Sequence, residues 1–358
     1  MVQYLMSSEK HYISVQTKDG ETVRKILLTL ELLDSRYKIF SEDGTLYFPI
    51  KSKLIGDQFS ILNSTISIDT GVRDFDEIPQ DRRTLGDALE GKIPPEELSL
   101  LPRAYDLIGD IAVLEIPDEL ATYSTLIGEV FHNIHSNFNT VLAKKGAVSG
   151  TTRVREYTLL AGEDRTKTIH TEYGCRLAVD VAKAYFSPRL LEEHNRIAQL
   201  VQSGETVVDM FCGVGSFAIH IAKQKEAKVI AIDINQSAID LLCESIGLNK
   251  LVGTILPVAA DTHDYVNTNE LSADRVIMNH PSGASDFVGE ACSILKPGGT
   301  MHYYDFIGGD TPEDTLKEKV TRLVENEGRK VKNIDLVRRV RDSAPYEFQM
   351  VADIVIQE

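Results

Sequence analysis

The sequence predicts an α/β protein in which a doubly wound parallel sheet forms the C-terminal domain and two smaller α+β domains precede it. Three observations predict this. From about residue 186 onward, short apolar runs alternate with helical segments. One of these runs, TVVDMF, leads directly into a glycine turn and a helical segment, CGVGSFAIHIA. Upstream, an acidic, proline-containing stretch separates two regions of mixed strand and helix pattern.

The composition is that of an ordinary globular chain with room for two or three domains. Of 358 residues, 38 are Lys or Arg and 54 are Asp or Glu, so the formal net charge is −16. This excludes a uniformly basic nucleic-acid coat protein, although local basic patches remain compatible with it. The chain lacks a signal-peptide pattern and an apolar run of about 18–20 residues, so we expect a cytoplasmic protein without membrane contact. The cysteines are far apart and form no CxxC pair, so we expect reduced thiols and no metal site.

The first two domains follow in order along the chain. Residues 1–68 carry strand-like HYISVQT and TLYFPIKS around helical GETVRKILLTLELL, which predicts a small α+β domain. We expect an acidic linker over 69–103, because nine acidic and four basic residues lie in 69–98, with a short helix at 85–89. A middle α+β domain is expected over 104–183, where the strand-like segment AYDLIGDIAVLEIP is followed by a helical run and then by further residues with strand character.

The C-terminal domain is expected over 184–358. Its candidate parallel strands are TVVDMF, KVIAID, RVIMNHP and TMHYYDF. Its candidate helices are HNRIAQLV, SFAIHIAKQ, QSAIDLLCESIGLN and ASDFVGEACSIL. Near the C-terminus, NIDLVRRV and EFQMVADIVIQ have strand character and are separated by RDSAPY, which predicts a hairpin added to the edge of the sheet.

The glycine turn is a candidate cofactor loop. Gly213 and Gly215, with Ala218 three residues further on, satisfy G-x-G-x-x-A. Glycines there allow a tight turn and a close approach of ligand to backbone at a helix start, and either NAD or S-adenosylmethionine can use them.

Acidic residues at three strand ends favour S-adenosylmethionine. Asp209 ends the first strand, where a carboxylate suits a cationic amino-acid group better than a pyrophosphate. Asp233 follows Gly213 by 20 residues, at the end of the next strand, and can accept ribose hydroxyls. Asp261 follows the third strand, where it can bind the adenine amine, although an Asp in this place can also be a helix N-cap. The glycine loop contains no Lys or Arg, and the whole pattern resembles class I methyltransferases.

A second motif follows the next strand. Asn279, His280 and Pro281 stand at its carboxyl end, the edge where ligands bind in open α/β sheets. Pro281 restricts the backbone of His280, while Asn279 offers an amide beside a backbone carbonyl. The turn can grasp a planar, amine-bearing base. It resembles the N-P-P-[FYW] motif of amino methyltransferases, and the alternative is an ordinary strand-to-loop turn.

Further segments along the chain add to these motifs: RVRE, LAGEDRT, YFSPRLLEE, VDMFCGVGSF, AIDIN and MNHP. Together, the motifs and segments resemble the archaeal and eukaryotic tRNA (guanine-37-N1)-methyltransferases over nearly the whole chain. The N-terminal domain resembles the extra domain of the archaeal enzymes. Two departures stand out: Cys212 and Ser216 flank the glycine loop where the family has Ala and Pro, and His280 replaces the family's Leu.

The resemblance implies a mechanism and a set of site residues. Guanine N1 carries a proton, so its methylation needs a general base, and the family match assigns this role to Glu193. Arg153 matches the cation that stabilises negative charge on O6, and Asn279, beside Pro281, would hold the exocyclic amine. The remaining implied cofactor contacts are Phe211 and Ile234, and the implied substrate contacts are Arg155, Tyr185, Arg189 and His280.

The resemblance also implies partners and leaves alternatives open. The implied partner is tRNA, bound at its anticodon arm and outer corner by a monomer. Basic residues outnumber acidic ones by nine to four from 315 to 341, which provides phosphate-contact candidates. The alternatives are methylation of a tricyclic wyosine precursor, aminocarboxypropyl transfer at the same tRNA position, or a tRNA-binding protein without catalysis. An NAD oxidoreductase is more distant, because no matching hydride-transfer residues are visible.

Overall fold

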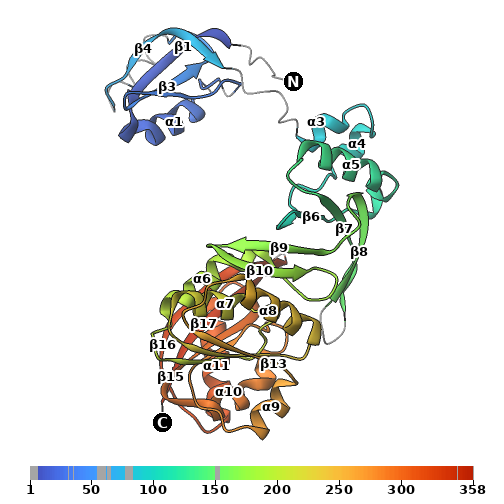
Figure 1. Ribbon diagram of the computed structural model, residues 1–358. Coiled ribbons are helices and arrows are strands. Elements are labelled where there is room, and N and C mark those ends of the chain that lie inside the picture. The colour runs from blue at the N-terminus through green and yellow to red at the C-terminus, as the bar shows by residue number, and fades with distance from the viewer. Residues whose placement is uncertain are drawn as a thin grey trace. The chain divides into compact units, whose positions relative to one another are not determined.

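The computed structural model describes residues 7–30, 32–34, 36–54, 62, 66–76, 84–149, 154–344 and 346–357. The chain divides into two compact units, Met1–Thr84 and Leu85–Glu358, coloured blue to cyan and teal to red in Figure 1. The predicted site residue Arg153 lies outside the described residues. None of the helices in the described ranges is long and apolar enough to span a membrane.

The first unit is an antiparallel four-stranded sheet with the order β2-β3-β1-β4. Val23 and Leu27 of the helix pack with Ile13 and Phe48 of the sheet in one apolar core. The prediction ended this domain at residue 68, but β4 pairs with β1 and belongs to the same sheet. Only Phe75 of β4 is buried, so this edge strand lacks the apolar alternation that would reveal it. The elements are β1 (Ser7–Gln16), α1 (Gly20–Thr29), β2 (Phe40–Glu42), β3 (Thr45–Ile50) and β4 (Asp69–Asp76).

The middle region forms a second four-stranded sheet with the order β5-β6-β7-β8. The short helix expected at 85–89 is present, but it is part of this domain's core, because the fully buried Leu89 packs in the same cluster as Ile127 and Phe131. The elements are α3 (Leu85–Leu89), α4 (Pro95–Leu98), β5 (Asp106–Ile108), β6 (Ile111–Leu114), α5 (Ser124–Ile134), β7 (Thr140–Ser149) and β8 (Val154–Gly162), followed by the hairpin β9 (Lys167–Glu172) and β10 (Cys175–Asp180).

The C-terminal domain contains the predicted doubly wound sheet. Its order is β13-β12-β11-β14-β15-β17-β16, with β11 to β15 parallel and β17 antiparallel to β15. The predicted terminal hairpin is confirmed as β16 and β17 at the sheet edge. The strands are β11 (Thr206–Asp209), β12 (Lys228–Asp233), β13 (Thr254–Ala259), β14 (Ala273–Met278), β15 (Leu295–Gly308), β16 (Val331–Ala344) and β17 (Glu347–Ile356).

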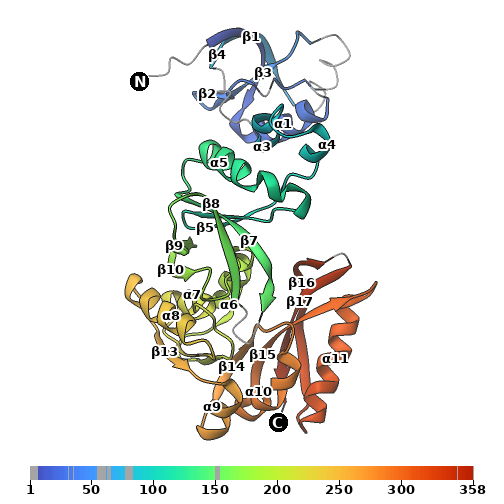
Figure 2. The same cartoon turned by 90° about the vertical axis from the view of Figure 1, so that its right-hand side faces the viewer.

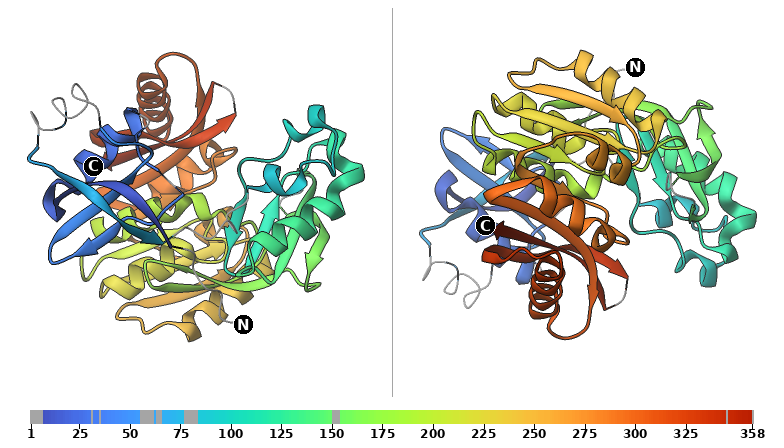
Figure 3. Two further views of the ribbon diagram at one scale, coloured as in Figure 1. Left: turned by 90° about the horizontal axis from the view of Figure 1, so that it is seen from above. Right: turned by 90° about the horizontal axis from the view of Figure 1, so that it is seen from below.

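Helices cover both faces of this sheet, as a doubly wound fold requires. One apolar cluster joins α6, α7 and α8 to one face, and a second joins α9, α10 and α11 to the other. Figure 2 shows α11 beside the red strands β16 and β17, and Figure 3 shows these strands from above and from below. The helices are α6 (Leu191–Leu200), α7 (Ser216–Gln224), α8 (Gln236–Leu248), α9 (Thr262–Thr268), α10 (Val288–Ile294) and α11 (Pro312–Asn326).

Candidate active site

The main cavity, of about 790 Å³, opens where β11, β12, β13 and β14 end. This is the edge at which open α/β sheets bind ligands, and the volume suits a nucleoside-sized molecule. Most of the site residues expected from the sequence meet there. Those lining the cavity are Tyr185, Phe211, Gly213, Asp233, Ile234, Asp261, Asn279, His280 and Pro281.

The glycine loop has the backbone that its sequence predicts. Gly213 and Gly215 have φ values of 53° and 82°, in the left-handed region that side chains rarely adopt. Gly215 is the N-cap of α7, and a Cβ there would lie 2.2 Å from Cδ1 of Leu242. The loop therefore needs glycine at 215 both for its turn and for the packing of α8 beneath it.

Asp209 is a buried carboxyl at the end of β11. Its exposed fraction is 0%, and neither carboxylate oxygen has a hydrogen-bond partner within the described residues. Burial raises the pKa of Asp209 to about 8, and only the nearby backbone amide of Phe211 opposes this shift. An unpartnered buried carboxyl is costly, and a cationic group of a ligand would relieve that cost.

Asp233 and Asp261 have partners of their own. Asp233 accepts hydrogen bonds from the backbone amides of Gly213, at 2.7 Å, and Asn235, at 2.8 Å. Burial nevertheless raises its pKa. Asp261 is the N-cap of α9 and accepts a 2.8 Å hydrogen bond from the backbone amide of His263. The N-cap alternative is thus correct for Asp261, which also lines the cavity.

The Asn279-His280-Pro281 turn has an aromatic neighbourhood. The carbonyl of His280 accepts hydrogen bonds from the amides of Gly283 and Ala284, which closes the turn over Pro281. The imidazole lies 5.0 Å from the ring of Phe211, centroid to centroid. Gln349 of β17 donates to Oδ1 of Asn279 at 3.2 Å. The turn therefore presents an amide beside two neighbouring rings, tilted by 40° to each other, and the ring of His280 as well as its backbone takes part.

A second, smaller cavity adjoins the first. It has a volume of about 280 Å³ and shares Tyr185, Phe186, Ser187 and Arg341 with the main cavity. Basic side chains dominate its lining, against the single carboxylate of Asp106. The Nε of Arg155 is buried there without a hydrogen-bond partner. The basic residues that line it are Lys144, Arg155, Arg189 and Arg341.

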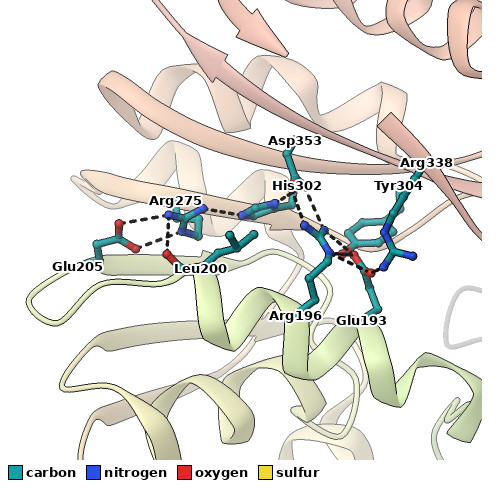
Figure 4. A network of polar contacts seen from close by, with 9 residues as sticks. All are labelled: Glu193, Arg196, Leu200, Glu205, Arg275, His302, Tyr304, Arg338 and Asp353. Carbon is teal, nitrogen blue, oxygen red and sulfur yellow. Dashed lines mark hydrogen bonds and ion pairs between the residues drawn. The ribbon is translucent and has the colours of Figure 1, made fainter. Parts of the chain in front are cut away.

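Glu193 lies in a buried ion-pair network instead of the cavity wall. It is 1% exposed, and it is absent from the described lining of both cavities. Its carboxylate accepts hydrogen bonds from Arg196, at 2.6 Å, and from the hydroxyl of Tyr304, at 2.6 Å, and it pairs with Arg338 of β16. Figure 4 shows how the network continues along the sheet. Its further members are Asp353, His302, Arg275 and Glu205.

The network fixes the charge of Glu193. Burial by itself would raise the pKa of this carboxyl, but the hydrogen bonds from Arg196 and Tyr304 and the charge of Arg338 outweigh burial. The pKa of Glu193 therefore lies below its usual value, so the group is an ionised carboxylate at neutral pH. The raised pKa that would make a carboxylate a strong base is absent in this state.

Sequence reasoning missed the partners of Glu193. Arg196 is three residues away on the same helix, and this spacing could have revealed it. Tyr304 gave no signal, because it comes from β15, 111 residues further along the chain. Gln349, the partner of Asn279, was missed for the same reason, since it lies 70 residues beyond Asn279 on β17. Of the candidates for phosphate contacts, Arg338 pairs with Glu193 and Arg341 lines the main cavity.

Matches to protein families cover three stretches of the chain. Residues 168–337 match the TRM5/TYW2 methyltransferase domain, and residues 85–166 match the TYW2 N-terminal domain. Residues 13–57 match the tRNA methyltransferase 5 N-terminal domain.

Individual relatives extend over most of the chain. The tRNA (guanine(37)-N(1))-methyltransferase Trm5b of Pyrococcus abyssi is 39% identical over 342 residues, which are 95% of this chain and 97% of that protein. A tRNA(Phe) (4-demethylwyosine(37)-C(7)) aminocarboxypropyltransferase of Pyrococcus horikoshii is 34% identical over 74% of this chain and 94% of that protein.

Solved structures agree with the sequence relatives. A complex of aTrm5 with tRNALeu superposes with a TM-score of 0.67 at 37% identity, over 96% of this chain and 99% of that one. Trm5 of Methanocaldococcus jannaschii with adenosine gives a TM-score of 0.64 at 35% identity, over 97% and 99%. Adenosine is the nucleoside part of S-adenosylmethionine, which agrees with the expected cofactor. The class I fold and the resemblance seen in the sequence are confirmed, and the chain belongs to the TRM5/TYW2 methyltransferase family.

Proposed function

We propose that this protein transfers a methyl group from S-adenosylmethionine to N1 of guanosine 37 in tRNA. The observation that carries the proposal is the pair of adjoining cavities. One is bounded by acidic strand ends, and the other is rich in cations. A sulfonium cofactor suits the first, and a nucleotide with its phosphates suits the second.

The residues of the main cavity fit S-adenosylmethionine better than a dinucleotide. Asp233, which lines the cavity, would receive the cofactor's ribose hydroxyls. The unpartnered carboxyl of Asp209 is fully buried and is not among the described lining residues, but it ends the same edge of the sheet and would receive the ammonium group. Arg341 is the one Lys or Arg in the cavity's described lining, so a pyrophosphate would lack charge partners at the glycine loop. When bound, the cofactor supplies an electrophilic methyl group on a sulfonium centre.

The target base would lie between the two cavities. We infer that Asn279 holds its exocyclic amine and that the rings of Phe211 and His280 pack beside it. A base inside the anticodon loop is stacked, so it would have to turn out to enter. Tyr185, Arg155 and Arg189 would bind the flanking backbone. Arg153 keeps the role that the family resemblance implies, stabilising negative charge on O6.

Glu193 would take the proton from N1, and its present contacts set a condition on this step. Its oxygens are occupied by Arg196, Tyr304 and Arg338 and it lines neither cavity, so one contact must be exchanged and the carboxylate must turn toward the cavity first. Arg338 is the partner best suited to leave, because its side chain is 37% exposed and that of Arg196 is 20% exposed. A tRNA phosphate that attracts Arg338 would free one carboxylate oxygen and raise the pKa of Glu193.

The decisive experiment uses labelled cofactor and two transcripts. The protein is incubated with methyl-labelled S-adenosylmethionine and a tRNA transcript carrying G37, and in parallel with the same transcript carrying A37. Label on the first transcript alone, recovered as 1-methylguanosine, is the expected result. Label on neither transcript would contradict the proposal and favour a binding protein without catalysis.

A second candidate deserves a direct comparison because of the aminocarboxypropyltransferase relative. That reaction moves a different group of the same cofactor. Cofactor labelled separately in its methyl and its carboxyl carbon distinguishes the two, because each reaction leaves only one label on tRNA. The Asn279-Pro281 turn favours methyl transfer. A transcript or tRNA carrying the tricyclic precursor, offered in place of G37, tests the wyosine alternative.

A further inference from the structure

A buried cluster of two histidines and a glutamate lies behind the cofactor loop, and the mechanism above does not use it. Glu172 ends β9, His194 lies on α6 and His220 lies on α7. Their side chains are 1%, 4% and 0% exposed. One donor atom from each lies within 4.8 Å of the other two. Three separate elements thus converge on one point with metal-ligating groups.

The hydrogen bonds around His220 fix which of its nitrogens carries the proton. Its Nδ1 lies 2.8 Å from the backbone carbonyl of Ser216, which can only accept a hydrogen bond. Nδ1 is therefore the protonated nitrogen, and Nε2 has a free lone pair. A backbone carbonyl commonly orients a metal-binding histidine in this way.

The lone pair of His220 faces another acceptor. Its Nε2 lies 3.8 Å from Oε2 of Glu172, and neither this nitrogen nor Oε1 of Glu172 has a hydrogen-bond partner in the described structure. His194 places its Nδ1 2.7 Å from the same Oε2. Two unsatisfied acceptors this deep are costly unless a cation or proton donor joins them.

We propose that Glu172, His194 and His220 bind a divalent metal ion of the zinc class. Two imidazoles and one carboxylate are an established ligand set for zinc, with water at the fourth position. His194 would bind as the neutral imidazole, with Nδ1 as the ligand and its proton on Nε2. The nearby ammonium of Lys223 is engaged with the carbonyl of Gly174, and His170 contributes an outer contact 3.5 Å from Oε1 of Glu172.

The ion would tie together the elements that carry the active site. α6 carries Glu193 directly before His194, and α7 begins at the glycine loop. Zinc-to-ligand distances of about 2.0–2.2 Å place tetrahedral ligands about 3.3 Å apart, so the donors need to move by only about 1 Å. Tyr173 lies beside the cluster, with its ring 6.4 Å from that of His220, and is 51% exposed. A metal could enter from this side.

The test measures metal directly on the full chain. Protein stripped with a chelator is incubated with Zn²⁺ or Co²⁺, desalted and analysed for metal content. We expect about one ion per chain, an absorption spectrum of bound Co²⁺ without a thiolate charge-transfer band, and a Tm raised by about 5 °C or more. Glu172→Gln and His220→Gln should each lose the ion. His263→Gln is the matched control, because His263 is 62% exposed and pairs with Glu290 outside the cluster.

Several outcomes would overturn the proposal. The first is a metal content far below one ion per chain. The second is a metal content in both cluster variants equal to that of the wild-type chain. The third is a thiolate charge-transfer band, which would assign the ion to a cysteine. If the variants fail to fold, the wild-type chain still decides: a Tm that responds equally to Zn²⁺ and Mg²⁺ contradicts the site. A crystal structure of the zinc-treated protein that shows a water molecule in place of the metal ion among the three side chains would contradict the proposal as well.

Discussion

Glu193→Gln is the change that tests the proposed general base most directly. It keeps the shape of the side chain and removes the charge that faces Arg196 and Arg338. Removing one partner of a buried ion pair costs about 3–5 kcal/mol. Arg196 retains Asp353, 2.5 Å away, and Arg338 can reach water, so we expect the lower end, about 3 kcal/mol. At roughly 2–4 °C per kcal/mol for a domain of this size, the Tm should fall by about 6–12 °C.

Turnover should fall much further than this stability loss explains. Loss of a general base reduces kcat by about 10²–10⁴-fold. The assay is single-turnover methylation of a G37 transcript, run about 20 °C below the Tm of each variant so that every protein is folded. Binding of tRNA, measured separately by filter retention, should change by less than about threefold. The matched control is Glu192→Gln, the exposed neighbour that bonds only to the hydroxyl of Tyr173 among the described residues.

Two results would refute the reasoning. If Glu193→Gln retains more than about a tenth of wild-type turnover, Glu193 is a structural member of its network and another group takes the proton. If turnover and tRNA binding fall by the same factor, the loss reflects a damaged site. An equal loss in Glu192→Gln would show that the assay responds to any charge change on α6.

Three further predictions follow from the same geometry. Arg338→Gln should weaken tRNA binding, reduce the salt slope of that binding by about one unit and leave kcat equal or higher, as measured by salt-dependent binding and single-turnover kinetics. In the control variant Arg339→Gln, kcat should not change. A lower kcat in Arg338→Gln would contradict the proposed exchange of contacts. Gly215→Ala should lower the free energy of unfolding, measured in urea, by about 2–5 kcal/mol, because a Cβ there combines a positive φ with overpacking against Leu242. Gly204→Ala has a φ of 89° and open space around the added Cβ, so it should lower the free energy of unfolding by only about 1–2 kcal/mol. Equal losses in the two variants would contradict the packing argument. Asp209, whose pKa is about 8 in the free protein, is protonated below that pH and must ionise to pair with the cofactor's ammonium. The affinity for S-adenosylmethionine, measured by calorimetry, should therefore rise by up to about tenfold per pH unit from pH 6 to 7.5. Asp209→Asn should bind the cofactor weakly and without this pH dependence, and a pH dependence that persists in this variant would show that another group titrates.

Local sequence determined the parts of the molecule whose signal lies within a short stretch. The alternation of apolar strands and helices predicted the parallel sheet, because strands buried on both faces read as continuous apolar runs. The glycines at 213 and 215 predicted a tight turn, since both positions need positive φ. Strand ends placed Asp209, Asp233 and Asn279 at one edge, because the carboxyl ends of parallel strands meet there.

Only the tertiary structure decided which charges face one another. The state of Glu193 depends on Tyr304 and Arg338, which lie 111 and 145 residues away and reach it through the pairing of β15, β17 and β16. The cluster of Glu172 and His220 has the same origin, with its members 48 positions apart in the sequence. Electrostatic energy depends on distance and burial, and neither quantity is encoded in local residue spacing. For that reason the sequence identified the fold and the cofactor edge, whereas packing set the charge of the proposed base.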